Sequence, residues 1–256
     1  MNDEHPKIVN RDWRLQAITT LAEDFVSPFT GIAHKAGTPV EIAGFVKYQG
    51  QLLQMPVPNP GAVYLSLGQR AAEQAREILQ ELQGKLVKRV DGTNALPSDC
   101  DRILFDALEN LIACVVFAYT ALEAFANESI PDDYKFERIR GDKKCTELYS
   151  KDQIERHLSL DTKLDEVLPV IHSVVTPKGT KTWKMYIWLK NLRDRFIHLK
   201  SSDWRKSAPD SADEFVWTDL LSDQVLQAPS IALGIIEHYS SPDRPRWLKK
   251  IPFRAI

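Results

Sequence analysis

The 256-residue sequence predicts a mainly α protein, a helical bundle that carries a small N-terminal β-hairpin element. The stretch Asp101–Ser129 is apolar on nearly every side, which predicts a central helix covered by other helices. Apolar residues recur at helical spacing in Ala62–Val90 and in Thr182–Ser201, as expected of helices that pack against a common core. Near the N-terminus, the segments Val40–Tyr48 and Gln51–Met55 flank Gln49-Gly50, a pair typical of a tight hairpin turn.

The composition is that of a globular protein from a reducing compartment. A formal net charge of −2 argues against a strongly basic protein that binds nucleic acid through bulk charge. The three cysteines, Cys100, Cys114 and Cys145, form no CxxC pair and suggest no disulfide framework. The N-terminus lacks the basic segment and apolar run of a signal peptide, and Asp101–Ser129 is too interrupted for a membrane span. We therefore expect a cytoplasmic protein with no membrane partner.

Residues 1–61 differ from the rest of the chain, because Pro, Gly and β-branched alternation replace helical spacing. Val40–Tyr48 and Gln51–Met55 are the expected strands of the hairpin, and a helix near Asp12–Phe25 is weakly indicated. Pro56–Gly61 forces extended or turn backbone and should mark a boundary. The predicted units are an N-terminal extension with a short β-hairpin, a helical bundle and an extended C-terminal tail, at residues 1–61, 62–241 and 242–256.

The remaining elements follow from helix start and stop signals. Asp91-Gly92 should end the first long helix, and Pro131 should close the central one. Ser159 or Asp161 can cap a later helix, because both side chains accept hydrogen bonds from free backbone N–H groups. After the central helix we expect short helices at Asp133–Arg140 and Lys151–Leu158, a helix at Thr162–Val174, the helix Thr182–Ser201, a polar loop at Ser201–Asp213 and a closing helix within Phe215–Ser241.

Three polar residues interrupt the central helix on a single face. Thr120, Glu123 and Asn127 are spaced i, i+3 and i+7, which aligns them along one side of a helix. A buried carboxylate costs several kcal/mol unless it is paired, so a cation or a group of hydrogen-bond donors should face Glu123. A structural ion pair and a functional role both remain open. If its partner were left buried and unpaired, Glu123→Ala would cost about 1–3 kcal/mol.

The end of the helix Thr182–Ser201 carries Arg193, Asp194 and His198. A neutral imidazole can take or give a proton near pH 7, and a guanidinium can hold a phosphate in a two-point contact. Asp194, one turn before His198, could orient its ring. Together these groups suit cleavage of a phosphodiester in which the ribose 2′-hydroxyl attacks its own phosphate, without a metal. His198 lies about 140° from Arg193 around an intact helix, so the two would converge on a ligand lying across the helix or where the helix loosens.

The segment L-R-D-R-F-I-H resembles the R-x4-6-H motif of the HEPN superfamily, written here as Arg193-x4-His198 with a polar residue directly after the Arg. The earlier helix with Tyr119–Glu128 resembles the partner helix of bacterial HEPN-like proteins, where an acidic residue and an Asn recur in an apolar context. The order of the helices also fits, over roughly Ala62–Tyr239. The resemblance implies a HEPN-like helical bundle.

The same resemblance implies a homodimer that brings two R-x4-6-H motifs into one cleft and acts as a metal-independent endoribonuclease, as in toxin–antitoxin or phage-defence systems. Arg193 would stabilise the phosphate, His198 would transfer protons and Asp194 would be the polar support. Arg195 would contact a substrate phosphate or pair with Glu123. The implied partners are RNA, a second copy of the chain and an antitoxin or regulatory protein. No cofactor is implied.

The alternative is a non-catalytic HEPN-like module that binds a nucleotide, RNA or a protein partner. In that case Arg193 would satisfy Glu123, and His198 would simply end its helix. Exposure separates the two interpretations. Catalysis requires His198 and one Arg to open onto a shared cleft, whereas a His198 sealed by Phe196, Leu199 or the closing helix favours binding. No metal site is predicted, because no ligand spacing relates His157, His172 and His198.

Overall fold

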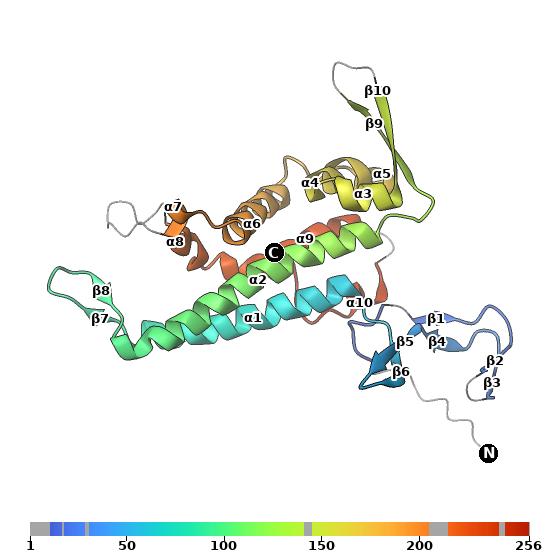
Figure 1. Ribbon diagram of the computed structural model, residues 1–256, viewed down its shortest axis with the longest axis horizontal. Coiled ribbons are helices and arrows are strands. Elements are labelled where there is room, and N and C mark those ends of the chain that lie inside the picture. The colour runs from blue at the N-terminus through green and yellow to red at the C-terminus, as the bar shows by residue number, and fades with distance from the viewer. Residues whose placement is uncertain are drawn as a thin grey trace.

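The structure is a computed structural model that describes residues 11–16, 18–28, 31–140, 145–204, 215–240 and 244–255. Its two longest helices, α1 (Pro60–Gln83) and α2 (Asp101–Glu128), lie side by side and antiparallel (Figure 1). Helices α6 (Lys181–Ile197) and α9 (Ala228–Tyr239) pack against α2 and against each other. The central position predicted for the apolar helix is confirmed, and its predicted start at Asp101 matches the structure.

The contact between α1 and α2 depends on small residues. A Cβ atom added at Gly68 would lie 3.4 Å from the backbone of both Cys114 and Ala118, so the two helices approach closely at this point. A Cβ atom at Gly61 would lie 3.6 Å from the carbonyl oxygen of Ala121. Further small residues of the two helices are fully buried in the core: Ala62, Ala72, Ala75 and Ala107.

Helix α2 is long and predominantly apolar. By length and composition alone, Ser98–Glu128 could cross a membrane, a test that the core helix of a soluble protein also passes. Its side chains at Leu111, Val115 and Leu122 are fully buried among the other helices. The side chains of α2 that can take part in a functional site are therefore those of its polar face.

Helix α1 begins at a buried cap. The Oδ1 atom of Asn59 accepts a hydrogen bond of 2.8 Å from the backbone N–H of Ala62, and Pro60 occupies the first helical position. The Nδ2 atom of the same side chain donates to Gln16 at 3.0 Å and to both carboxylate oxygens of Glu128 at 3.0 and 2.7 Å. Asn59 is fully buried, and its side chain ties the N-terminal extension to the first turn of α1 and to the end of α2.

Helix α1 is shorter than predicted, so the expected helix Ala62–Val90 is wrong over its last residues. The chain leaves the helix after Gln83 and forms strand β7 (Val87–Lys88), which pairs with β8 (Asn94–Ala95). Gly92 has a φ of +84° and turns the chain within this hairpin instead of ending a helix. Apolar residues at 86, 87 and 90 continued the helical spacing in the sequence, but the structure leaves them exposed.

The fold-class prediction, a mainly α HEPN-like helical bundle with one small N-terminal β-hairpin element, is wrong. The described chain forms five separate two-stranded antiparallel sheets, of which two lie beyond the N-terminal region. The N-terminal strands are β1 (Ile18–Thr20) paired with β4 (Pro39–Glu41), β2 (Phe25–Val26) paired with β3 (Ala33–His34), and β5 (Ala43–Tyr48) paired with β6 (Gln51–Pro56).

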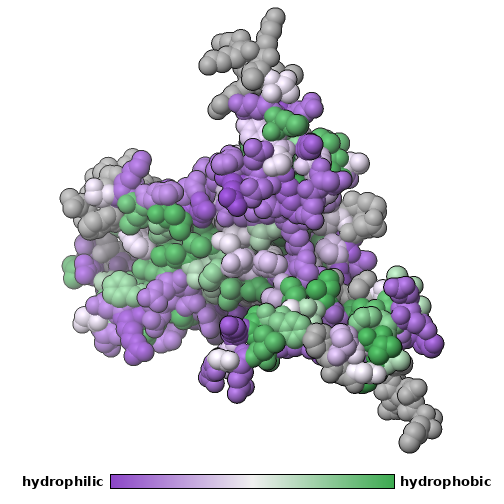
Figure 2. All heavy atoms as spheres, turned by 45° about the vertical axis from the view of Figure 1, so that its right-hand side comes forward, coloured by the Kyte–Doolittle hydropathy of each residue, from purple (hydrophilic) through white to green (hydrophobic). Residues whose placement is uncertain are grey.

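The predicted hairpin at Gln49-Gly50 is confirmed, and the weak helix near Asp12–Phe25 is not formed. Gln49 and Gly50 have φ angles of 50° and 78°, the left-handed values that a two-residue hairpin loop needs. This hairpin exposes the apolar side chains of Phe45, Val46, Leu52 and Leu53. Apolar residues also gather at the N-terminal strands in the space-filling view, at the lower right (Figure 2).

The helix predicted at Asp133–Arg140 is a strand, β9 (Lys135–Arg140), which pairs with β10 (Cys145–Ser150) in a hairpin that projects from the molecule (Figure 1). Its residues alternate, since Phe136 is buried while its neighbours on either side are exposed. The Phe136 ring lies 6.4 Å from that of Tyr149 on the partner strand. The many charges concealed this period of two in the sequence.

The helix predicted at Thr162–Val174 exists but contains a π-helical turn. Ser159 caps it, because its Oγ atom accepts a hydrogen bond of 3.2 Å from the backbone N–H of Thr162. Three pieces follow without a break in the helix: α4 (Leu160–Thr162), the π turn (Lys163–Val167) and α5 (Leu168–His172). The short helix α3 (Lys151–His157) precedes them, in agreement with the prediction at Lys151–Leu158.

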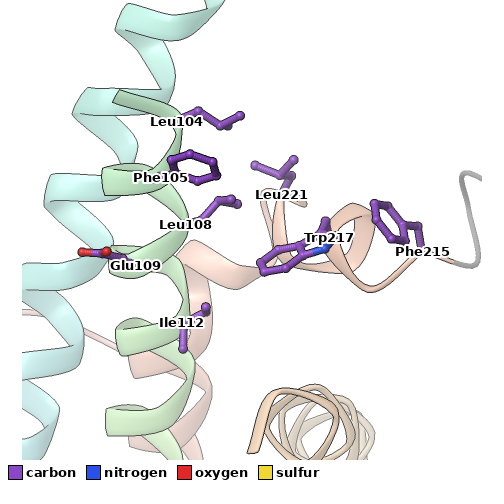
Figure 3. A pocket seen from close by; sticks show the side chains of 8 residues that line it. All are labelled: Leu104, Phe105, Leu108, Glu109, Ile112, Phe215, Trp217 and Leu221. Carbon is purple, nitrogen blue, oxygen red and sulfur yellow. The ribbon is translucent and has the colours of Figure 1, made fainter. Parts of the chain in front are cut away.

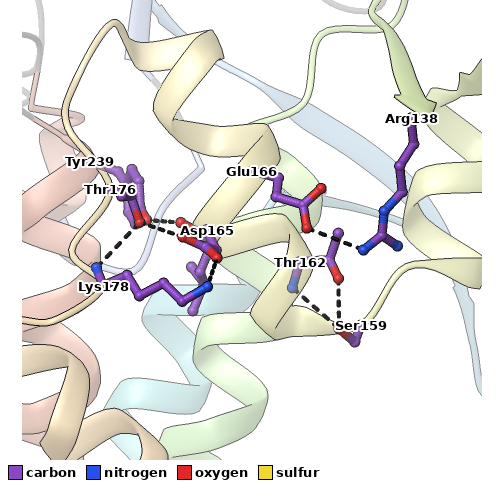
Figure 4. A network of polar contacts seen from close by, with 9 residues as sticks. Arg138, Ser159, Thr162, Asp165, Glu166, Thr176, Lys178 and Tyr239 are labelled. Carbon is purple, nitrogen blue, oxygen red and sulfur yellow. Dashed lines mark hydrogen bonds and ion pairs between the residues drawn. The ribbon is translucent and has the colours of Figure 1, made fainter. Parts of the chain in front are cut away.

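Side chains and backbone of the π turn contact several other elements (Figure 4). Asp165 accepts hydrogen bonds from Thr176 at 2.8 Å and from Lys178 at 2.5 Å. Glu166 pairs with Arg138 of β9 at 3.2 Å, and the hydroxyl group of Tyr239 donates to the carbonyl oxygen of residue 164. These contacts fix the position of the π turn between β9, α9 and the loop before α6.

The C-terminal part of the chain closes the core. Its helices are α7 (Ser201–Trp204), α8 (Val216–Leu220), α9 and α10 (Arg246–Lys249), with a 3₁₀ turn at Val225–Gln227. The expectation of an extended tail is wrong for α10, whose Trp247 and Leu248 are buried in the core. The predicted polar loop at Ser201–Asp213 begins with α7, and its residues from 205 onward lie outside the described residues.

We predict that Asn59→Ala lowers the free energy of unfolding by about 1–3 kcal/mol, because the change removes a helix cap and leaves buried polar groups unpaired. Urea unfolding followed by circular dichroism measures the change. Asn110→Ala is the control, because the Asn110 side chain donates only to a carbonyl oxygen of its own helix. Equal effects of the two substitutions would contradict the role of the buried cap.

We predict that His172 makes the protein sensitive to acid. Its Nε2 atom is buried and has no hydrogen-bond partner among the described residues, and its ring lies against Phe125 and Tyr239. Burial lowers the pKa of His172 from its usual value of 6.5. The unfolded chain therefore binds the proton more readily than the folded chain. The contribution of neutral His172 to the free energy of unfolding is fully present above pH 6.5 and is lost as the pH falls through the folded-state pKa.

Thermal unfolding of the wild type and of His172→Leu between pH 4.5 and 8 tests this effect. The loss of melting temperature on acidification should be smaller in His172→Leu than in the wild type. The control His157→Leu, at an exposed position on α3, should show the same change of melting temperature with pH as the wild type. A slope in His172→Leu as steep as that of the wild type would count against the prediction.

Candidate functional site

The helix that carries the Arg193-x4-His198 motif ends at the motif itself. Thr180 caps the start of α6 by accepting a hydrogen bond of 3.2 Å from the backbone N–H of Trp183. The last helical residue is Ile197, and the backbone N–H of His198 still donates to the carbonyl oxygen of Asp194 at 2.9 Å. His198 itself has φ −117° and ψ 43°, so the chain leaves the helix at this residue.

Arg193 faces the polar side of α2. Its Nη2 atom lies 3.6 Å from Oε1 of Glu123, and its Nη1 atom donates to Oδ1 of Asp194 at 2.8 Å. Its guanidinium carbon lies 4.4 Å from the ring centre of Tyr119, a cation–π contact. The prediction that a cation faces Glu123 is confirmed. The side chain of Arg193 is 24% exposed, so it stands at the edge of the core and keeps some access to solvent.

A layer of aromatic and charged groups supports Arg193 from below. The rings of Tyr119 and Tyr186 stack with centroids 6.4 Å apart. The hydroxyl group of Tyr186 donates to Asp161, and the same carboxylate pairs with Lys190. Burial raises the pKa of Tyr119 to about 12 and raises that of Tyr186 further, so both phenols are neutral at physiological pH. Arg193 therefore has a connected set of buried and half-buried neighbours in addition to Glu123.

Sequence reasoning did not assign these supporting residues to the site. Tyr119 lies one turn before Glu123 on α2, and Lys190 lies one turn before Arg193 on α6. Extending the two predicted faces by one helical turn would have found both. Asp161 gives no such signal, because it belongs to α4 and reaches the site only through the tertiary fold.

The three polar residues predicted on α2 have different surroundings. The side chain of Glu123 is 41% exposed, so it is half-buried instead of sealed in the core. Burial raises the pKa of Glu123, Arg193 and Lys163 oppose this effect, and Asp194 adds to it. Asn127 accepts a hydrogen bond of 2.8 Å from Nζ of Lys163. Thr120 donates to the carbonyl oxygen of residue 116 in its own helix, so it contributes no contact to the site.

Arg195 does not pair with Glu123, the partner that the sequence suggested for it. It forms an ion pair with Asp219 of α8, while the partner of Glu123 is Arg193. The adjacent ring of Phe196 lies 5.6 Å from that of Trp217 on α8. The two sides of α6 therefore have separate tasks, with Arg193 directed at α2 and Arg195 directed at α8.

His198 is open to solvent. Its side chain is exposed, and within the described parts of the chain its ring forms no hydrogen bond. Ile197 and Leu199 on either side are exposed as well, so neither seals the imidazole. The carboxylate of Asp194 binds Arg193, and no hydrogen bond between the side chains of Asp194 and His198 is formed. One chain thus presents an anchored arginine and, about one turn further on, an unanchored histidine.

An apolar groove lies next to the α8 side of α6. It has a volume of about 550 Å³ and lies between α2 and α8 (Figure 3). Among the described lining residues only Glu109 is charged, and its carboxylate points away from the apolar side chains in Figure 3. The described lining contains no Lys or Arg that could bind a phosphate, so we do not assign RNA to this groove. The lining residues are Leu104, Phe105, Leu108, Glu109, Ile112, Phe215, Trp217 and Leu221.

No group of three or more His, Cys, Asp or Glu side chains that could hold a metal ion occurs in the part of the chain that the structure describes. The free thiols of Cys100 and Cys114 are buried, and burial raises the pKa of Cys114 to about 12. Neither of these two cysteines is therefore a reactive thiolate.

The chain matches no protein-family model, and no curated protein or solved structure is detectably similar to it. The site must therefore be interpreted from its own geometry and from the motif.

We predict that Glu123→Ala lowers the free energy of unfolding by less than about 1 kcal/mol, because a half-exposed ion pair contributes little to stability. This value replaces the larger loss expected of a buried pair, since Arg193 keeps Asp194 and the Tyr119 ring as partners. Urea unfolding measures it. A loss above about 2 kcal/mol would show that the pair behaves as a buried one.

Proposed function

We propose that the chain is a metal-independent endoribonuclease of the HEPN superfamily. The proposal rests on the resemblance of the Arg193-x4-His198 motif and its partner helix, and not on the overall fold. The observation that supports it most is the open imidazole of His198, placed at the end of a helix whose Arg193 is fixed against α2. A sealed His198 would have favoured binding alone.

In the proposed reaction, His198 removes the proton of a ribose 2′-hydroxyl group, and the 2′-oxygen attacks the adjacent phosphorus. The bond from phosphorus to the 5′-oxygen breaks, and that oxygen takes up a proton. The products are a 2′,3′-cyclic phosphate and a 5′-hydroxyl end. Arg193 stabilises the negative charge that develops on the phosphate oxygens. Its guanidinium has five N–H donors, of which Asp194 and Glu123 engage two, so donors remain for the phosphate.

One histidine cannot serve as base and acid in the same step. A second copy of the chain would supply the other His198, so we infer that the active form is a homodimer. We further propose a cytoplasmic setting in defence or in a toxin–antitoxin pair, with an antitoxin or regulatory protein as partner. Arg195, which pairs with Asp219, would be a further contact to a substrate phosphate.

The second candidate is a non-catalytic module that binds RNA, a nucleotide or a protein. One observation favours it. Arg193 already contacts two carboxylates and the ring of Tyr119, which is the arrangement expected when the arginine has a purely structural task.

We predict that the purified protein cuts RNA in the presence of EDTA, and that His198→Ala and Arg193→Ala each lower the cleavage rate by roughly 100-fold or more. Gel analysis with end-labelled RNA would also reveal the 2′,3′-cyclic phosphate and 5′-hydroxyl ends. Matched controls come from α3, where His157→Ala and Arg156→Ala remove exposed side chains near the end of a helix and should leave the rate unchanged.

If neither the wild type nor any variant cuts RNA while the wild type binds it, and Arg193→Ala abolishes this binding, the non-catalytic module replaces the ribonuclease. Loss of activity in the α3 controls to the same extent as in His198→Ala would also overturn the assignment of the site. Light scattering coupled to gel filtration tests the dimer directly, and a monomeric active protein would contradict the two-histidine scheme.

A further inference from the structure

Lys163 is a buried cation beside the site. It is 5% exposed, and its Nζ atom donates to Oδ1 of Asn127 at 2.8 Å and to the carbonyl oxygen of Glu155 at 2.9 Å. Burying an ammonium group costs several kcal/mol unless other groups compensate it. Burial accordingly lowers the pKa of Lys163, while the carboxylates of Glu123 and Glu155 raise it. A lysine that serves only to fill space would be replaced at lower cost by an apolar residue.

The π turn fixes the place of Lys163. The backbone N–H of Leu168 donates to the carbonyl oxygen of Lys163, five residues earlier, which is the hydrogen bond of a π helix. The next residues of the turn are bound to α9, to the loop before α6 and to β9, through residue 164, Asp165 and Glu166. Single π turns inside α-helices are rare and occur often at functional sites.

Lys163 and Arg193 contact the same face of α2. Asn127 lies one turn after Glu123 on this face, so the ammonium group that donates to Asn127 is about one helical turn from Glu123 along α2. Arg193 approaches Glu123 from α6, and Lys163 approaches from the π turn. Two cations from different elements thus act on one half-buried carboxylate.

The charge of Glu123 depends on all the groups around it. Burial raises its pKa, Arg193 and Lys163 lower it, and Asp194 raises it. The remaining charged or titratable groups near this cluster are Tyr119 on α2, Asp161 on α4, Glu155 on α3 and Lys190 on α6.

We propose that Lys163 is a positioning residue of the Arg193–His198 site, because its buried ammonium group keeps Glu123 ionised and ionised Glu123 holds Arg193 in place. The effect on cleavage rests on the proposed ribonuclease function. The effect on Glu123 does not, because it concerns two residues of the folded chain. Lys163 touches no substrate in this scheme and acts only through Glu123.

The closing experiment measures Glu123 directly. In full-length protein labelled with ¹³C at glutamate side chains, the Glu123 carboxyl signal is assigned by its loss in Glu123→Gln and followed from pH 3 to 9. In Lys163→Met the midpoint of this titration should move to higher pH. Lys178→Met is the matched control, because it removes a cation that binds the same π turn but pairs with Asp165, and the Glu123 midpoint should stay.

RNA cleavage provides the second readout. For each protein, the cleavage rate at pH 5.5 is divided by its own rate at pH 8. This ratio should be roughly tenfold smaller in Lys163→Met than in the wild type, which corresponds to about 1.4 kcal/mol of transition-state stabilisation. A purely structural role would lower the rate equally at both pH values. Lys163→Gln, which removes the charge and keeps a hydrogen-bond donor, replaces Lys163→Met if the latter does not fold.

The two proposals fail separately. An unchanged Glu123 midpoint in both Lys163 variants overturns the role of Lys163, whether or not the protein cuts RNA. A wild type that never cuts RNA overturns the ribonuclease, while a raised midpoint in Lys163→Met still supports the control of Glu123 by Lys163. A midpoint that rises equally in Lys178→Met would also overturn the inference, since the effect would then come from the π turn as a whole.

Discussion

The close approach of α1 and α2 is the constraint on which the rest of the structure depends. Gly68 lies at a point of close approach, where an added Cβ atom would come to 3.4 Å from the backbone of Cys114 and Ala118. With one side of α2 occupied in this way, α9 and α6 cover much of the rest of its apolar surface, and burial of that surface stabilises the core. The orientation of α2 about its own axis follows from this packing, and with it the direction in which Glu123 and Asn127 point.

The site is a consequence of that orientation. The polar strip of α2 meets α6 and the π turn, the two elements that carry Arg193 and Lys163. The stacked rings of Tyr119 and Tyr186 are buried, and the Tyr119 ring contacts the guanidinium group of Arg193. His198 stands outside this cluster at the end of α6. Arg193 is therefore held at the edge of the core, whereas His198 is exposed at the surface.

Much of this arrangement could be predicted from periodicity alone. The start of α2, the helix that carries Arg193 and the hairpin at Gln49-Gly50 follow from local patterns, and so does the cation beside Glu123. The strand β9 was missed because dense charge hid its alternation, and the end of α1 was missed because exposed valines continued its spacing. Lys163 could not be found, because it reaches the site through a tertiary fold and a π turn that no sequence pattern signals.

The π turn also limits how this chain can change in length. A π turn is an α-helix with one extra residue, and each residue advances the helix by about 100°. Deleting a single residue between Lys163 and Val167 would restore a regular α-helix, because the turn takes up its extra residue locally. The deletion would remove or shift one of the residues that bind α9, the loop before α6 and β9. Insertions and deletions should therefore be far better tolerated in the hairpin β7–β8 than in this one turn.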